Sequence, residues 1–317
     1  MKRLTGWGLA LALVVGCGGE KNDNSGAAGS TVDRPDDADA DTDADTDADT
    51  DADTDADTDS GEGSDSGTTD PPSWPGSDVA DRQAMVDTMV AAAQAFLDSL
   101  DDYQRGQVQY SLDDAERTDW SNLPHAVYHR EGVSFGELNE DRMALGWELI
   151  RVSLSAAGLQ RTQDIVQMEK LLWEDGDMNA FPGAYFFTVF DEPSSETPWG
   201  WQLDGHHLAL NFSVVGPEVT ITPSLWGTTP MTWPSGEHAG LSPMAAEEDV
   251  AFEWISSLNE DQLTLAQLSA DADPDLMAGP TSIQADWPEP AGVPVTDLDG
   301  DQRKALLDWI AIYVGNL

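Results

Sequence analysis

Two adjacent histidines, His206 and His207, follow a glycine in the middle of the chain and are its most chemically informative residues. Neutral imidazole and carboxylate groups suit zinc, iron or copper. One interpretation is therefore that an imidazole from this pair joins a carboxylate to hold a divalent metal ion such as zinc. The candidate carboxylates are those of Glu169, Glu174 and Asp204. An open coordination position would polarise water for hydrolysis, although the chain contains neither His-Glu-x-x-His nor His-x-His.

Two other interpretations need no metal ion. In the first, His207 acts as a general base, Asp204 orients an imidazole, and Arg130 holds an anionic substrate. In the second, both imidazoles and Asn211 only satisfy backbone or carboxylate partners within a packed sheet. The candidate catalytic residues are thus His206, His207, Asp204 and Arg130, and the candidate metal ligands are His206, His207 and Glu169.

A β-strand over residues 199–215 is expected to position both histidines, with a hairpin at Gly216-Pro217 and a second strand at 218–222. Alternate residues of a strand lie on opposite faces of the sheet. Adjacent imidazoles would then serve one site only if a β-bulge at Gly205 rotated one of them. The expected faces are Trp201, His207 and Asn211 on one side, and Gln202, Asp204, His206, Leu208, Leu210 and Phe212 on the other.

Tryptophans are concentrated around this predicted strand, at Trp199, Trp201, Trp226 and Trp233. Aromatic rings form stacking platforms for sugars or hydrophobic ligands when exposed, and they fill protein cores when buried. The sequence leaves both roles open for the tryptophans, whereas Phe187, Phe190 and Phe212 are expected in the core.

Helical spacing of apolar residues frames the strand region. Ser77 or Asp78 can cap the first helix, and the acidic segment 297–301 can cap the last. Residues 184–190 are aromatic and β-branched, which predicts a further strand. This order predicts an α+β fold, a single domain over residues 77–317 with helices flanking a small antiparallel sheet. The predicted helices are 79–100, 143–158, one that opens at Thr162 or Asp164, 243–258, 260–268 and 299–314.

The segment 185–190, the Trp199-Gly200-Trp201 motif, the run 205–208 and Asn211-Phe212 together resemble a bacterial family of unassigned role, the domain-of-unknown-function family 3500. The resemblance extends over nearly all of residues 79–317. It includes residues 96–100, Arg117, Trp120, Pro124, residues 130–132, Gly227, Pro230, residues 240–248 and the last helix. The family implies no established activity. Its members carry an acidic residue before Gly-His-His, where this chain has Asp204, whereas His125, His129 and His238 match no pattern of the family.

The N-terminus resembles an export signal. Lys2 and Arg3 precede an apolar stretch at residues 9–15, which is shorter than the roughly 20 residues of a membrane-spanning helix. Val14-Val15-Gly16-Cys17 then resembles the lipobox of bacterial lipoproteins. The resemblance implies that residues 1–16 are a signal peptide and that the thiol of Cys17 receives a diacylglycerol anchor. An ordinary secretory signal is the alternative. Cys17 is the only cysteine, so disulfides and thiol chemistry are excluded from the mature protein.

Residues 17–76 are expected to form a disordered tether after the lipidated cysteine. Asp-Thr-Asp-Ala repeats fill residues 41–60 and offer nothing apolar to bury. A flexible coil of this length spans on the order of 40 Å.

Acidic residues dominate both the tether and the predicted domain. Residues 18–76 hold 19 acidic and 2 basic residues, and residues 77–317 hold 41 and 10, so their charges are −17 and −31. With +2 from the first 17 residues, the total is −46. A polyanion would be repelled, so nucleic acid is not an expected partner.

Two functional classes follow from the sequence. One is a hydrolase-like enzyme of the cell envelope, lipid-anchored at the periplasmic face or the outer membrane surface, with a His/carboxylate site and a possible divalent metal cofactor. The other is a non-catalytic envelope lipoprotein that binds a small ligand or a protein partner. Convergence of imidazole and carboxylate groups in a partly dry hollow would favour the enzyme.

Overall fold

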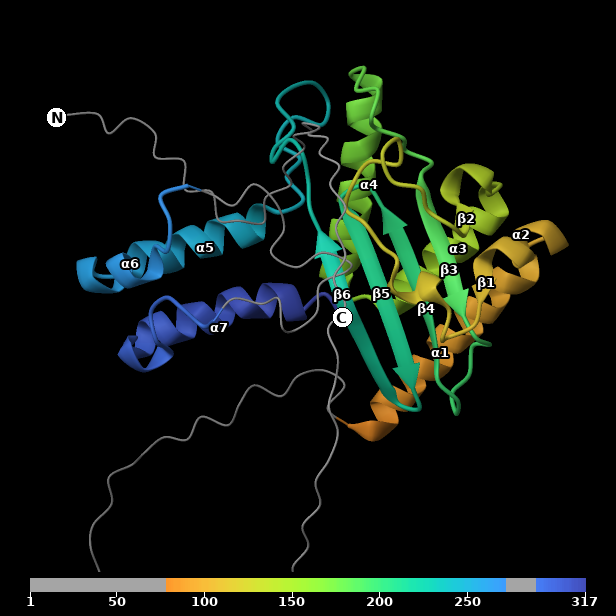
Figure 1. The fold of residues 1–317 in the computed structure, drawn as a ribbon, viewed down its shortest axis with the longest axis horizontal. Coiled ribbons are helices and arrows are strands. Elements are labelled where there is room, and N and C mark those ends of the chain that lie inside the picture. The colour runs from red at the N-terminus through yellow and green to blue at the C-terminus, as the bar shows by residue number, and fades with distance from the viewer. Residues whose placement is uncertain (1–77, 272–288) are drawn as a thin grey trace, which may run out of the picture. The chain divides into compact units, whose positions relative to one another are not determined.

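The computed structural model describes residues 78–271 and 289–317, so Cys17, the predicted signal peptide and the predicted tether lie outside the described residues. The first helix, α1 (Val79–Ser99), matches its prediction and is capped by Asp78, whose carboxylate accepts from the backbone N–H of Ala80 at 2.6 Å. A short helix, α2 (Asp102–Val108), follows and leads into the sheet. These residues confirm an α+β fold (Figure 1).

The sheet is mixed, which corrects the expectation of a purely antiparallel one. Its main path runs β1-β3-β4-β5-β6, and β2 pairs with β3 off this path. All pairs are antiparallel except that of β1 with β3, which is parallel. Two short strands from the connection after α2 extend the sheet at the same edge of β3. The strands are β1 (Gln109–Tyr110), β2 (Val133–Ser134), β3 (Tyr185–Phe190), β4 (Trp199–Gly205), β5 (Leu208–Val215) and β6 (Glu218–Trp226).

The predicted strand over residues 199–215 is wrong in one respect, because it is two antiparallel strands. The chain reverses at His206 and His207, and Gly205 pairs with Leu208 across the turn. The predicted hairpin at Gly216-Pro217 is present and joins β5 to β6. The reversal also changes which residues share a face, since Trp201 pairs with Phe212, Leu203 with Leu210, and Gln202 with Asn211.

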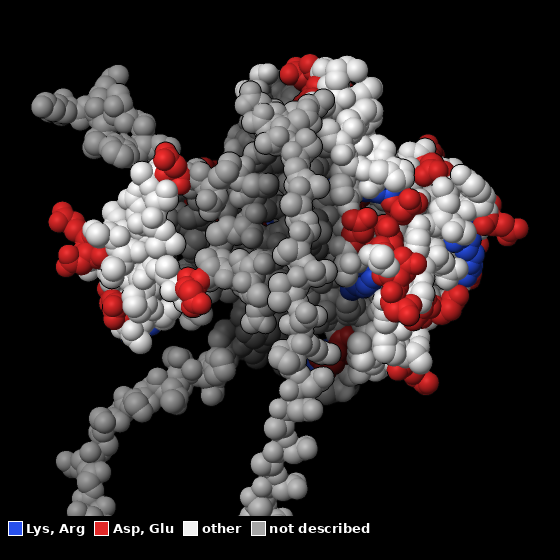
Figure 2. All heavy atoms as spheres, in the orientation of Figure 1, with Lys and Arg blue, Asp and Glu red and all other residues white. Residues whose placement is uncertain are grey.

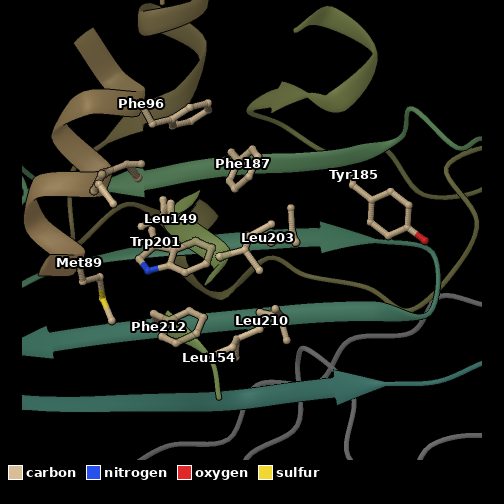
Figure 3. Close-up of a cluster of buried hydrophobic side chains, with 14 of the residues drawn as sticks. Met89, Phe96, Leu149, Leu154, Tyr185, Phe187, Trp201, Leu203, Leu210 and Phe212 are labelled. Atoms are coloured by element: carbon tan, nitrogen blue, oxygen red, sulfur yellow. The ribbon is translucent and has the colours of Figure 1, made fainter. Parts of the chain in front are cut away.

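One face of the sheet packs against helices and forms the main core. The rings of Trp201 and Phe212 stack at 4.3 Å, and Phe96 of α1 lies 4.8 Å from Phe187. Leu149 of α3 (Glu140–Ser153) belongs to the same cluster (Figure 3). The predicted core positions of Phe187, Phe190 and Phe212 are confirmed. Trp199, Trp201 and Trp226 are buried as well, so they offer no exposed stacking platform.

The boundary between the second and third helices differs from its prediction. Helix α3 ends at Ser153, and α4 (Ala156–Glu174) begins at once, with Ser155 as its cap. Gly158 is therefore inside the first turn of α4 rather than at the end of α3. A Cβ atom at this position would lie 2.3 Å from the carbonyl oxygen of Asn316, so close packing of the C-terminal segment explains the glycine.

The described residues of the C-terminal part include three α-helices that match their predictions within a few residues. They are α5 (Ala245–Ser257), α6 (Glu260–Ala266) and α7 (Gly300–Val314). Asp299 caps α7 as expected, and Gln262 and Gln302 exchange hydrogen bonds between α6 and α7. Short 3-10 helices lie between the longer elements. The helix η1 (Ala115–Thr118) lies within the β1–β2 connection, η2 (Phe135–Glu137) lies between β2 and α3, and η4 (Val295–Asp297) precedes α7.

Acidic side chains outnumber basic ones on the face of the described residues seen in Figure 2. Among these residues, none of the helices has the length and apolar character needed to cross a membrane.

Candidate functional site

The β4–β5 turn is the element that brings the two histidines together. His206 and His207 are its two central residues, and only His207 has a positive φ, 63°, as the second central residue of a type II turn does. Their rings consequently stack at 3.8 Å with an angle of 26° between the planes. The predicted obstacle, side chains on opposite faces of one strand, does not arise, and no bulge at Gly205 is needed.

Three backbone contacts hold the turn in place. The N–H of His207 donates to the carbonyl of Asn122 at 3.1 Å, and the N–H of Gly227 donates to the carbonyl of His207 at 2.8 Å. The hydroxyl of Tyr185 donates to the carbonyl of His206 at 3.3 Å. Sequence reasoning missed Asn122 and Tyr185 as supports of the site, because neither contact is local in the chain.

Glu169 completes the cluster from helix α4. Its Oε2 atom lies 2.8 Å from Nδ1 of His206, and its Oε1 atom accepts from the backbone N–H of Phe181 at 2.8 Å. The side chain is buried, as are both imidazoles. Glu174, the alternative carboxylate, is exposed and pairs with Lys170, so it does not contribute to the cluster.

His207 is the residue of the cluster whose side chain is both unpaired and shifted in its pKa. Its Nε2 atom is buried and has no hydrogen-bond partner among the described residues. Burial, together with the neighbouring His206, lowers the pKa of His207 to about 3. His207 is therefore a neutral imidazole at pH 7 with a lone pair available to a ligand.

The Glu169–His206–His207 cluster fits a small metal ion. One ligand atom from each residue lies within 4.8 Å of the other two. Ligand atoms about 2.0–2.2 Å from a tetrahedral zinc ion lie roughly 3.3–3.6 Å apart, so ligand atoms at the 4.8 Å limit would have to approach one another by about an ångström. Two imidazoles with a carboxylate are also a donor set that zinc accepts, and the unpartnered Nε2 of His207 would gain a partner.

Asp204 and Arg130 belong to a separate polar network. Nε of Arg130 donates to Asp204 at 2.9 Å, and its NH2 group donates to the carbonyls of Ser121 and Leu123. The backbone N–H of Ser121 donates to both carboxylate oxygens of Asp204. Burial raises the pKa of Asp204 to about 7, since desolvation outweighs the charge of Arg130.

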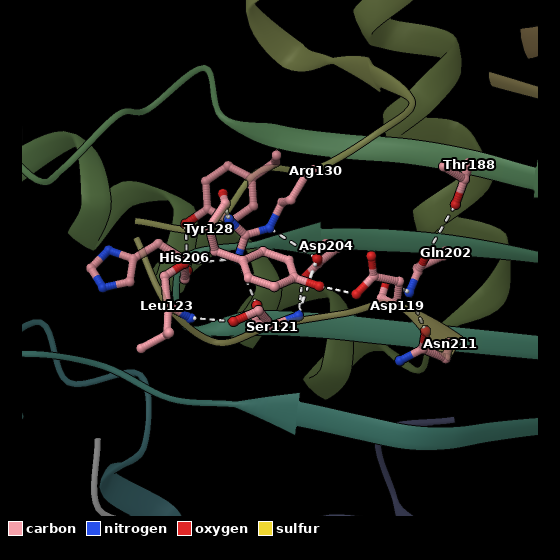
Figure 4. A network of polar contacts seen from close by, with 11 residues as sticks. Asp119, Ser121, Leu123, Tyr128, Arg130, Thr188, Gln202, Asp204, His206 and Asn211 are labelled. Carbon is pink, nitrogen blue, oxygen red and sulfur yellow. Dashed lines mark hydrogen bonds and ion pairs between the residues drawn. The ribbon is translucent and has the colours of Figure 1, made fainter. Parts of the chain in front are cut away.

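The residues of the expected active-site constellation thus lie in two separate groups of contacts. The ring of His206 points away from Asp204 and Arg130 (Figure 4), and the carboxylate contacts of Asp204 are with Arg130 and Ser121 rather than an imidazole. The Arg130 side chain is 2% exposed, so it has little surface for an anionic substrate. The catalytic roles of these two residues remain predictions that the observed contacts do not support.

The network instead fastens the connection between β1 and β2 to the sheet. Thr188, Gln202 and Asn211 continue it along the polar face, with Gln202 donating to Asn211 at 2.6 Å. Trp120 of the connection packs on Ala209 and Leu225 of the same face. Asn211 therefore has the structural role that the sequence left open, since its amide also donates to the carbonyl of Pro223.

Comparison with known proteins identifies the family of this chain but assigns it no activity. No curated protein and no solved structure matches the chain. Residues 82–317 match the family described as "Protein of unknown function (DUF3500)". The match includes Glu169, both histidines, and the Arg130–Asp204 pair. The chain therefore belongs to the DUF3500 family, as its sequence resemblance predicted.

Proposed function

We propose that this protein is a lipid-anchored protein of the cell envelope that binds a divalent metal ion, zinc first, through Glu169, His206 and His207. The observation that carries the proposal is the buried group of Glu169, His206 and His207, which offer one ligand atom each within 4.8 Å of one another, and in which Nε2 of His207 has no hydrogen-bond partner among the described residues. A buried polar atom without a partner costs free energy, and a metal ion would remove that cost.

The protonation states favour metal binding at neutral pH. A low pKa keeps His207 neutral, so no proton competes with a metal ion for its lone pair. Glu169 would give up its hydrogen bond with His206 and supply negative charge, while its bond from Phe181 would keep the carboxylate in place. Three protein ligands would leave one position open, and zinc in such a site lowers the pKa of bound water to about 7.

Zinc titration of the purified full-length chain tests the proposal. The chain is stripped of metal, and zinc binding is followed by calorimetry and elemental analysis. We expect stoichiometric binding to the wild type and an affinity at least about tenfold lower in Glu169→Gln, His206→Ala and His207→Asn. Asparagine is chosen at position 207 because it tolerates a positive φ.

His129→Ala is the matched control, because this imidazole is exposed, pairs with Glu131 and lies near the ring of His125 rather than in the cluster. The proposal fails if the wild type binds no stoichiometric zinc, or if the control loses as much affinity as the cluster variants.

Metal binding is compatible with two functions. The bound zinc would serve hydrolysis in one of them, and in the second candidate the protein binds zinc without catalysis. The burial of all three residues, with exposures of 3% for Glu169, 8% for His206 and 3% for His207, favours that candidate by leaving little surface for a substrate. Zinc-loaded protein is assayed with p-nitrophenyl acetate and bis(p-nitrophenyl) phosphate. Zinc-dependent hydrolysis that disappears in His207→Asn supports the enzyme, whereas bound zinc without hydrolysis of either probe supports the binding protein.

The anchor is tested at Cys17. In a bacterial host that processes lipoproteins, a clickable fatty acid should label the wild type and leave Cys17→Ser unlabelled. The wild type should also fractionate with membranes. An unlabelled wild-type chain released in soluble form would instead indicate an ordinary secretory signal.

A further inference from the structure

A cavity of about 260 Å³ lies beside the Glu169–His206–His207 cluster but is not lined by any of its three residues. Its lining comes from the β1–β2 connection, β2, η2, the end of α4, the α4–β3 connection and β3. The cluster and the cavity share Phe181, whose ring lines the cavity and whose backbone N–H binds Glu169.

Four of the nine residues that line the cavity carry aromatic rings. Trp173 and Phe181 lie 5.7 Å apart, and the ring of His125 lies 5.1 Å from Phe186 and edge-on to Phe181 at 6.4 Å. Trp173 is 45% exposed, whereas tryptophan side chains are highly buried on average. The backbones of Gly136 and Gly183 meet at one side, where the N–H of Gly136 donates to Gly183 at 3.0 Å.

The polar groups of the lining are few. Ser134 is already engaged, because its hydroxyl donates to Glu137 at 2.7 Å. His125 makes no hydrogen bond or ion pair within the described part of the chain, and its Nδ1 is buried without a partner. Burial, Arg130 and His129 lower the pKa of His125, which keeps it neutral at pH 7. The lining contains no carboxylate and no basic side chain other than this imidazole.

We propose that this cavity, the Trp173–His125 pocket, binds a small neutral ligand with one aromatic ring and a single polar substituent, of which phenol is the simplest example. The pocket is open to solvent on one side, and its volume of about 260 Å³ is large enough for one ring. Aromatic walls favour ring stacking and edge contacts. A sugar would lose water from the hydroxyl groups that it turns toward the wall, and one unpaired polar side chain could replace few of those hydrogen bonds. An anion would find no positively charged group in the lining, because the imidazole of His125 is neutral at pH 7.

Ligand-detected NMR titrations of the full chain with phenol, toluene and benzoate test this assignment. His125→Phe keeps a ring but removes the polar edge, so phenol affinity should fall about two- to tenfold while toluene affinity is retained. Trp173→Leu should weaken phenol and toluene alike, and its exposure means that the core is left intact. Benzoate should bind more weakly than phenol to the wild type.

Tyr103→Leu is the matched control, since Tyr103 is an exposed aromatic residue of α2 outside the cavity lining. The proposal is overturned if phenol shows no saturable binding, if benzoate binds as tightly as phenol, or if neither pocket variant changes phenol binding. Failure of zinc binding would leave the assignment standing, because no cluster residue lines the pocket.

Discussion

His207 combines two features that are rarely found together in a residue with an ordinary structural role. It adopts a positive φ, which few non-glycine residues do, and its buried Nε2 lacks a partner among the described residues. Left-handed backbone in such a residue costs on the order of 1–3 kcal/mol and persists where the surroundings enforce it. Here Asn122 and Gly227 enforce it through hydrogen bonds to the His207 backbone. The cluster geometry is therefore built into the turn before any ligand binds.

The low pKa of His207 predicts a pH dependence of stability in metal-free protein. Folded His207 has a pKa of about 3 and unfolded histidine one of about 6.5, so between these values the unfolded state binds more protons. The contribution of His207 is complete above pH 6.5 and falls by about 1.4 kcal/mol per pH unit below it.

His207→Asn lacks this titration, so the stability difference between wild type and variant should change by about 2 kcal/mol, to the detriment of the wild type, from pH 7 to pH 5. Urea denaturation in the presence of a chelator measures it. Titration of Asp204 is common to both proteins and cancels. A difference that stays constant with pH would contradict the assignment.

Elements that lack regular structure carry much of the tertiary organisation. The β1–β2 connection covers the polar face of the sheet and supplies Arg130, Ser121 and Trp120 to it. The C-terminal segment reaches the start of α4, where Ser155 donates to the carbonyl of Asn316. Arg161 of α4 forms an ion pair at 2.8 Å with Glu247 of α5. Burial raises the pKa of the Glu247 carboxyl.

We predict that the Arg130–Asp204 pair stabilises the β1–β2 connection, and that removing one partner costs more stability than removing both. At a pH well above the pKa of about 7 of Asp204, where its carboxylate is ionised, Asp204→Asn leaves a buried guanidinium without its counter-charge and should lower the free energy of unfolding by about 3–5 kcal/mol. The double variant Arg130→Met/Asp204→Asn should recover part of that loss. Arg151→Ala, which breaks an exposed pair with Glu148, should cost about 1 kcal/mol or less. Equal losses in the buried and exposed pairs would refute the role given to the network.

Gly158 and Gly106 make a matched test of how α4 meets the C-terminus. Both glycines lie in helices, where alanine is preferred by up to about 1 kcal/mol. A Cβ atom at Gly106 meets nothing within 4 Å, whereas one at Gly158 meets the backbone of Asn316 at 2.3 Å. Thermal unfolding should therefore show Gly106→Ala to be stabilising and Gly158→Ala to be destabilising. Stabilisation by both would mean that the C-terminal contact is absent in solution.

At the scale of the whole molecule, the charge of −46 is spread over the predicted tether and the domain. A large net charge opposes the compact state through self-repulsion, and salt screens that repulsion. Raising NaCl from about 0.01 M to about 1 M shortens the Debye length from about 30 Å to about 3 Å. We therefore expect the urea midpoint to rise with salt, and a falling midpoint would show that attractive ion pairs dominate instead.

Local pattern in the sequence was sufficient for most elements of this protein. Helical spacing located α1, α5 and α7, and a run of aromatic and β-branched residues located β3. These features follow from side-chain periodicity, which the chain carries within each segment. The α+β class and the importance of the Gly-His-His segment followed from the same kind of reasoning.

Tertiary structure alone decided how the functional groups meet. The turn at His206 and His207 has little local signal, because histidine is not a usual residue at the second central position of a turn. Glu169 reaches His206 across 37 residues, and Arg130 reaches Asp204 across 74. Pairings of this kind depend on packing between elements rather than on periodicity within one. The sequence therefore determined the elements and the candidate side chains, and the packing of α4 and the β1–β2 connection against the sheet decided their partners.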